Sequence, residues 1–166
     1  VFHFRNPRRL LVWSGPPYDR EKDREYATRF DQFPGRKVLS GGTTANIASR
    51  ELGRDVVMQL GHSRAAVPAQ SEMSGVDLVT EGALTLAKTI EYLEENRRPS
   101  IPDGASALAE ILLDSDDIEF MVGSRINEAH LDPSLPIIPG LRRNLIDRLA
   151  EILRQRYLRD VSVICI

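Results

Sequence analysis

The chain has 166 residues, 42% of them hydrophobic and 28% charged, which is typical of one soluble domain of about 100–200 residues. Its 22 basic and 24 acidic residues give a formal net charge of -2, which argues against a general affinity for nucleic acid or an anionic membrane. The single cysteine, Cys165, excludes an internal disulfide, and its apolar surroundings predict a buried thiol in a cytoplasmic protein. No apolar run of about 18 residues predicts a membrane span.

The first third of the chain alternates apolar runs with turns. At the start of the chain Phe2 and Phe4 alternate with Val1, His3 and Arg5, and Asn6-Pro7 then breaks the pattern. Because the chain begins at Val1, we expect residues 1–9 to be a strand remnant or linker from an upstream domain. Residues 10–13 predict a strand that ends in Ser14-Gly15 and two prolines. The charged segment 19–33 predicts a surface helix with a narrow buried face.

Residues 37–52, KVLSGGTTANIASREL, form the most informative stretch of the chain. A short apolar strand meets Gly41-Gly42 and Thr43-Thr44, and apolar residues then recur at helical spacing. Glycines allow a sharp turn and close approach to a ligand, and a threonine hydroxyl is placed to cap the helix. The start of such a helix suits an anion, although the motif matches neither GxxxxGK[ST] nor GxGxxG. A plain strand-to-helix turn without a ligand explains the same residues.

The remainder repeats this pattern. Strands are predicted at 55–60, 76–79, 118–122 and 161–166, and helices at 83–93, 105–113 and 141–157. Gly53 is expected to end the helix before it, and 61–74, 96–104 and the proline-rich segment after Arg125 are expected to be loops. Alternating strands and helices predict a Rossmann-like three-layer α/β fold over residues 10–166, with a mostly parallel sheet of about six strands.

In such a sheet, ligands bind at the carboxyl ends of the strands. Four predicted strands end in small or polar residues, which we expect to share one pocket for a phosphate or a carboxylate. The candidate ligand-binding residues are Ser14, Gly15, Gly41, Gly42, Thr43, Thr44, Thr80, Glu81, Gly82, Gly123, Ser124, Arg125, Asn127 and His130. Glu81 suits a ligand hydroxyl or a proton-transfer role, or else it caps its own helix. Ordinary turn composition is the alternative explanation for all four turns.

Other chemistry has weaker support. The spacing of a zinc site is absent from the three histidines, His3, His62 and His130. The sequence also contains no GxSxG motif, which would indicate a hydrolase. Asp114, Asp116 and Asp117 are typical of a solvated turn before a buried strand. The residues single out no cofactor and no metal site.

Four segments carry a resemblance to a known family: SGPP, SGGTTANIASRELGR, SGVDLVTEGALTLAKTIEYL and FMVGSRINEAHLDPSLP. From residue 10 onward the chain resembles the region downstream of the phosphatase domain in some bacterial stage II sporulation protein E family proteins. Those are metal-dependent serine/threonine phosphatases of the PPM type. The resemblance implies that residues 1–4 are the last strand of a missing phosphatase domain.

The resemblance does not extend to the catalytic metal site. PPM-type phosphatases use aspartates that hold two metal ions to activate a water. Here Asp116-Asp117-Ile118-Glu119 has glutamate where that family's segment has threonine, and the other metal-binding motifs are missing. We therefore expect no phosphatase activity from this chain itself.

Three hypotheses follow. The chain is a non-catalytic module that binds a small anionic, phosphate- or nucleotide-like ligand and regulates an upstream phosphatase domain. Alternatively, it is an enzyme acting on a nucleotide or sugar phosphate, with Glu81 or His130 as acid or base and Thr43-Thr44 on the phosphate. The third possibility is a dimerisation domain, a homodimer without a ligand. None of the three involves nucleic acid or a membrane.

Overall fold

The computed structural model describes residues 5–58, 71–96, 99, 101–125 and 140–166. The strands in these ranges are β1 (Arg9–Ser14), β2 (Arg36–Ser40), β3 (Val56–Met58), β4 (Ser71–Met73), β5 (Leu78–Thr80), β6 (Asp117–Val122) and β7 (Asp160–Cys165). The helices are the short η1 (Arg20–Lys22), then α1 (Asp23–Asp31), α2 (Gly42–Leu52), α3 (Ala83–Glu95), α4 (Gly104–Leu113) and α5 (Leu141–Tyr157).

The strands form one seven-stranded sheet in the order β3-β4-β5-β2-β1-β6-β7. The run from β5 to β7 is entirely parallel, and β4 pairs antiparallel with both β3 and β5. The predicted mostly parallel α/β fold is confirmed, but the prediction of about six strands and of a loop through residues 61–74 missed β4. Three residues, Ser-Glu-Met, are too short to show a strand period, so only their pairing makes them a strand.

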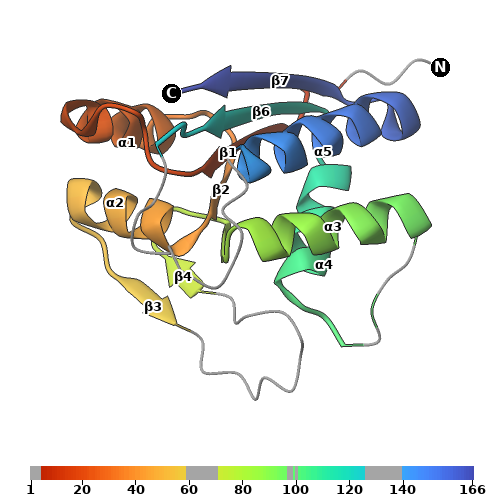
Figure 1. Cartoon of the computed structure of the whole chain (residues 1–166), viewed down its shortest axis with the longest axis horizontal. Coiled ribbons are helices and arrows are strands. Elements are labelled where there is room, and N and C mark those ends of the chain that lie inside the picture. The colour runs from red at the N-terminus through yellow and green to blue at the C-terminus, as the bar shows by residue number, and fades with distance from the viewer. Residues whose placement is uncertain (1–4, 59–70, 97–98, 100, 126–139) are drawn as a thin grey trace.

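Helices cover both faces of the sheet, giving the three layers of a Rossmann-like fold (Figure 1). Helices α1 and α2 pack on one face with Leu11, Trp13 and Leu39. Helices α3, α4 and α5 pack on the other, with Leu10 and Val12. Because β1 lies centrally and is covered on both sides, its apolar run is continuous rather than alternating.

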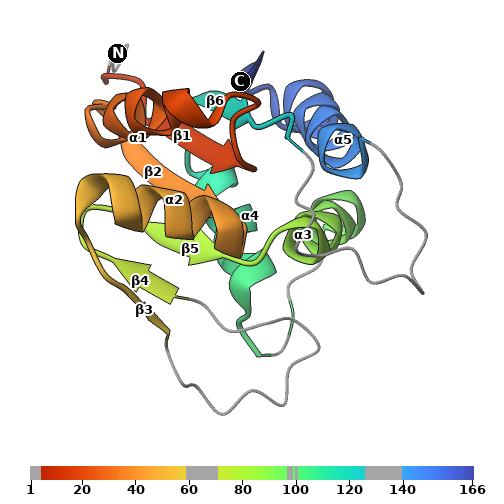
Figure 2. The ribbon, with the colours of Figure 1, turned by 60° about the vertical axis from the view of Figure 1, so that its left-hand side comes forward.

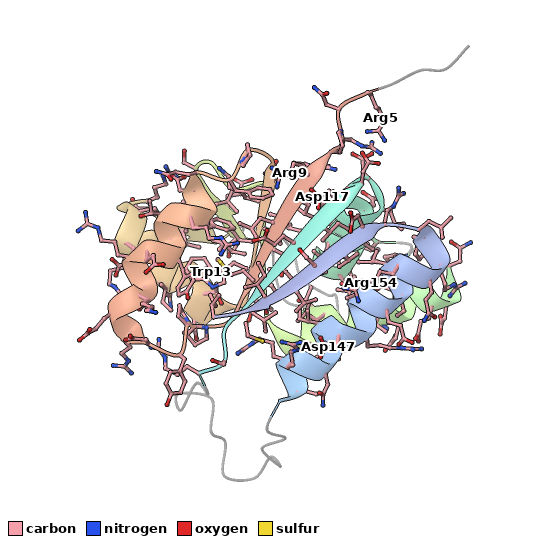
Figure 3. All side chains as sticks on the ribbon, turned by 90° about the horizontal axis from the view of Figure 1, so that it is seen from above. Arg5, Arg9, Trp13, Asp117, Asp147 and Arg154 are labelled. Carbon is pink, nitrogen blue, oxygen red and sulfur yellow. The ribbon has the colours of Figure 1, made fainter. Side chains whose placement is uncertain are left out.

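The aromatic residues of the charged helix lie where its pattern predicts. Phe30 of α1 is fully buried, and its ring centroid lies 5.7 Å from that of Trp13. Figure 3 shows Trp13 on the α1 side of the sheet. Tyr26 and Phe33 are partly buried against the same cluster. Gly53 ends α2 in the left-handed conformation at φ 63°, which confirms its predicted role.

An ion-pair network lies at the amino edge of the sheet. The turn between α4 and β6 carries Asp114, Asp116 and Asp117, as the sequence predicts. Arg5 donates two hydrogen bonds to Asp116, of 2.7 and 2.8 Å, and Arg9 lies 3.1 Å from Asp117 (Figure 3). Arginines at positions 8, 36 and 159 complete the network. These carboxylates are therefore bound to guanidinium groups.

The N-terminal segment is joined to the sheet through this network. Residues 5–8 have no regular secondary structure, and β1 begins at Arg9. Residues 1–4, predicted as a remnant strand, lie outside the described residues. The division between a remnant at 1–9 and a domain from residue 10 stays a prediction.

Cys165 corrects one prediction. The thiol is exposed, because the residue is the last of the edge strand β7. An apolar run predicts burial only for a strand whose two faces are covered and which has a neighbouring strand on each side. Strand β7 has a neighbouring strand on one side only. In the described part of the chain, no helix is both long and apolar enough to cross a bilayer.

Candidate functional site

The carboxyl ends of β1, β2, β5 and β6 lie at one edge of the sheet, because these four adjacent strands are parallel. The structure therefore brings together the four small, polar turns that the sequence singles out. The edge contains two junctions at which neighbouring strands lead to helices on opposite faces. These junctions lie between β2 and β5 and between β1 and β6. Such divergence opens the crevice in which α/β proteins hold ligands.

At the first junction two glycines face each other. A Cβ built on Gly82 would lie 3.7 Å from the Cα of Gly41, which is van der Waals distance. The Gly41 N–H donates to the carbonyl of Thr80 over 2.8 Å, which joins the two turns. Gly41 has φ 117°, a conformation that favours glycine. Figures 1 and 2 show the first turn of α2 beside the segment that leads into α3.

Both helices that begin here lack a side-chain cap. The residues preceding them are Gly41 and Gly82, and neither helix has an acidic residue in its first turn. The prediction that a threonine hydroxyl caps α2 is wrong, and Glu81 does not cap α3. The side chain of Glu81 is exposed instead. Two positive helix ends therefore lie side by side with no acidic residue in either first turn, and the carboxylate of Glu81 lies one residue before the cap position of α3.

A row of hydroxyl residues lies behind these turns. Ser14, Ser40 and Thr80 are the last residues of β1, β2 and β5, are in register and are buried. They share the face that carries Val12 and Val38, beneath α3, α4 and α5. Thr80 and Ser40 donate to the carbonyl of Glu81, over 3.0 and 3.5 Å. Ser14 Oγ has no hydrogen-bond partner in the described part of the chain.

Thr44 joins two turns rather than facing the edge. Its buried hydroxyl accepts a hydrogen bond from the backbone N–H of Gly15 over 2.8 Å and donates to the carbonyl of Ser40 over 3.4 Å. These bonds attach the end of β1 to the first turn of α2. Thr43, one position earlier, is half-buried.

The second junction is closed on one side by backbone packing. A Cβ on Gly123 would overlap the carbonyl oxygens of Gly15 and Pro16. Ser124 donates its hydroxyl to the carbonyl of Ile166 over 3.0 Å. The turn after β6 thus lies directly on the turn after β1.

Arg125 belongs to a separate pair on the α1 side. Its guanidinium lies 3.9 Å from Asp23, a buried residue at the start of α1 that also accepts a 2.7 Å hydrogen bond from Arg50. A ligand anion would therefore have to compete with Asp23 for the guanidinium of Arg125. Asn127 and His130, its predicted companions, lie outside the described residues.

Arg142 is the residue that sequence reasoning missed. It lies in the first turn of α5 beside Gly15, where a Cβ would overlap its guanidinium, and it donates a 3.3 Å hydrogen bond to the carbonyl of Gly123. Burial lowers the pKa of Arg142. No carboxylate pairs with it among the described residues. The sequence feature that could have identified Arg142 is its position in the first turn of a predicted helix, where the charge of a basic residue is unfavourable with the helix dipole.

A hollow lies away from this edge, where α3 and α5 end beside α4. It has a volume of about 220 Å³, and its lining includes Tyr92, Leu93, Pro102, Leu113 and Tyr157. None of the candidate residues contributes to it. The described residues contain no cluster of histidine, cysteine and carboxylate side chains able to hold a metal ion.

No family model, curated protein or solved structure matches this chain. The function proposed for this chain therefore depends on the geometry of the carboxyl edge.

Proposed function

We propose that this chain is an α/β module that binds a small anionic ligand, phosphate- or nucleotide-like, at the junction between β2 and β5. The single observation that carries the proposal is the pair of uncapped helix starts at Gly41 and Gly82. Backbone N–H groups at a helix start are donors without partners inside the helix, and the helix dipole favours negative charge there. Two such ends in contact suit a phosphate better than either alone.

Within this proposal the other residues have distinct roles. Gly42 opens the approach to α2, since nothing lies within 4 Å of the position that its Cβ would occupy. Thr44 sets the position of the turn from behind. Glu81, exposed at the same edge, accepts hydrogen bonds from hydroxyl groups of the ligand.

We further propose, from the resemblance of its motifs to the region downstream of the phosphatase domain in the stage II sporulation protein E family, that ligand binding regulates such a phosphatase domain. Residues 5–8 support this idea. Arg5 and Arg8 bind the acidic turn that leads into β6, and the opposite end of β6 forms part of the ligand edge. A cytoplasmic location remains part of the same proposal.

The test compares two substitutions at Gly42 in a thermal-shift and fluorescence titration with inorganic phosphate. Gly42→Asp places a carboxylate at the first position of α2, which favours the helix but repels an anion. Gly42→Ala adds the same Cβ without charge. Trp13, the single tryptophan, donates to the carbonyl of Gly15 over 2.9 Å and reports on the edge by its emission.

The parent chain and Gly42→Ala are expected to gain roughly 2.7 kcal/mol when phosphate reaches about a hundred times its dissociation constant. Gly42→Asp is expected to gain nothing. Equal phosphate responses in the Asp and Ala variants would overturn the proposal. An enzyme would show turnover of a phosphate ester that Glu81→Gln abolishes, and a dimerisation domain would show no phosphate response and a concentration-dependent mass.

A further inference from the structure

Arg142 has no counter-ion among the residues that the structure describes. Helix α5 has 17 residues, begins after Gly140 without a side-chain cap, and has no acidic residue in its first turn. A positive charge at this end of a helix is unfavourable. The next residue, Arg143, is paired with Asp147 at 2.8 Å, whereas Arg142 has no carboxylate partner among the described residues.

The guanidinium of Arg142 is also partly shielded from water. The guanidinium packs against Gly15, and its hydrogen bond to the carbonyl of Gly123 is long at 3.3 Å. A partly buried cation that has no carboxylate partner in the described part of the chain costs free energy, which a bound anion would recover. An independent observation points the same way. Ser14, directly before Gly15, is fully buried and its hydroxyl has no partner within the described residues.

The position of Arg142 relative to the first junction is set by the sheet. The phosphate site proposed above lies between β5 and β2, and Arg142 lies over the junction of β1 and β6. These junctions are two strand positions apart. Because neighbouring strands lie about 4.8 Å apart, the two positively charged sites are separated by roughly 10 Å along the edge.

We propose that the ligand carries two anionic groups, one held by the starts of α2 and α3 and the other by Arg142 and Ser14. Its chemical class is a small bisphosphate, such as a polyol or sugar with phosphates at both ends, rather than a monophosphate. Arg142 is then the residue that sets specificity for the second anionic group. This inference rests on the proposed function, because the first phosphate occupies the site described there.

The experiment is a calorimetric titration of the whole chain with a series of probes. The probes are inorganic phosphate and the bisphosphates and monophosphates of propanediol, butanediol, pentanediol and hexanediol. Bisphosphate affinity is expected to rise with chain length until the phosphates span the two sites, and there to exceed that of the matching monophosphate by about tenfold, the factor expected for one charge-assisted pair.

Arg142→Gln should remove this advantage and retain the phosphate binding that Gly42→Asp abolishes. Arg143→Gln is the matched control, with the same charge change one residue away, and should retain the advantage. If Arg142→Gln does not fold, Ser14→Ala should reduce the advantage in the same selective way.

The outcomes separate the two proposals. If inorganic phosphate binds the parent but not Gly42→Asp, and bisphosphates of every length bind no tighter than monophosphates, the second site is refuted and the first stands. If Arg142→Gln and Arg143→Gln lower bisphosphate affinity equally, the effect is one of general charge and the role of Arg142 is refuted. If no phosphate binds the parent, the proposed function itself fails.

Discussion

The backbone N–H of Gly15 donates to Thr44 Oγ1 over 2.8 Å, so the end of the central strand is bonded directly to the first turn of α2. The pair spans two of the turns that form the candidate site. Its geometry makes Thr44 a positioning residue, because its hydroxyl is buried and already engaged.

Thr44→Val is expected to lower the free energy of unfolding by about 1–3 kcal/mol, since it leaves the buried Gly15 N–H without its acceptor. Thr85→Val is the matched control. Thr85 Oγ1 is buried without a partner in the described part of the chain, so its loss should be neutral or stabilising. Urea denaturation of both variants checks the pair. If both variants lose the same free energy of unfolding, the hydrogen bond between Gly15 and Thr44 adds no stability beyond the packing of the side chain.

Gly123→Ala is expected to destabilise the fold by about 1–3 kcal/mol, because the new Cβ would overlap two backbone carbonyls that cannot move independently. Gly42→Ala makes the same chemical change where nothing lies within 4 Å, and should be neutral or stabilising by up to about 1 kcal/mol. Thermal and urea unfolding of the two variants compare these positions. A tolerated Gly123→Ala would contradict the close contact between the turns after β1 and β6.

The Arg5–Asp116 pair predicts an acid-dependent contribution to stability. The Arg5 guanidinium, and next the Arg8 backbone N–H, lower the pKa of the Asp116 carboxyl from its usual 3.8. Because the pKa is lower in the folded state, the stabilisation is complete above about pH 4 and is lost as the pH falls through the folded-state value.

Asp116→Asn should therefore unfold more easily than the parent at neutral pH, and the gap between the two should narrow below about pH 4 and in high salt. Urea unfolding across a pH series measures this gap. Asp147→Asn, which breaks an exposed pair within α5, should have a smaller effect. A gap that stays constant down to about pH 2 would contradict the role of Asp116 ionisation.

Cys165 is expected to react fully with a thiol reagent in the folded chain, without denaturant, since it is exposed at the end of an edge strand. One thiol per chain should be labelled, at a rate similar to that of a small thiol compound in solution. Labelling that requires urea would contradict the exposure of this residue. Cys165→Ser should change stability by no more than about 0.5 kcal/mol, as is usual for surface substitutions.

Several elements were predictable from residue pattern. The strand around Leu11 and the helix ending at Gly53 have the apolar runs and the glycine terminator that local sterics favour. The gathering of the four polar turns followed from the order of elements, because strands linked through helices run parallel and end at the same edge.

Other features depended on pairing across the fold. The strand β4 consists of three residues whose assignment rests on hydrogen bonds to β3 and β5. The cap of α2 also could not be inferred, since Thr44 has a partner in Gly15, 29 residues earlier in the chain. Long-range partners of this kind leave no local signal.

The sequence by itself determined the layered α/β architecture and the glycine-rich turns at its edge, because hydrophobic periodicity and backbone freedom are local properties. Only the tertiary structure decided which charges are balanced. Arg142 and Arg143 are adjacent and chemically identical, yet one has Asp147 on its own helix while the other lies against Gly15 from the opposite end of the chain. Desolvation and charge pairing depend on neighbours in space, and the fold alone supplies those neighbours.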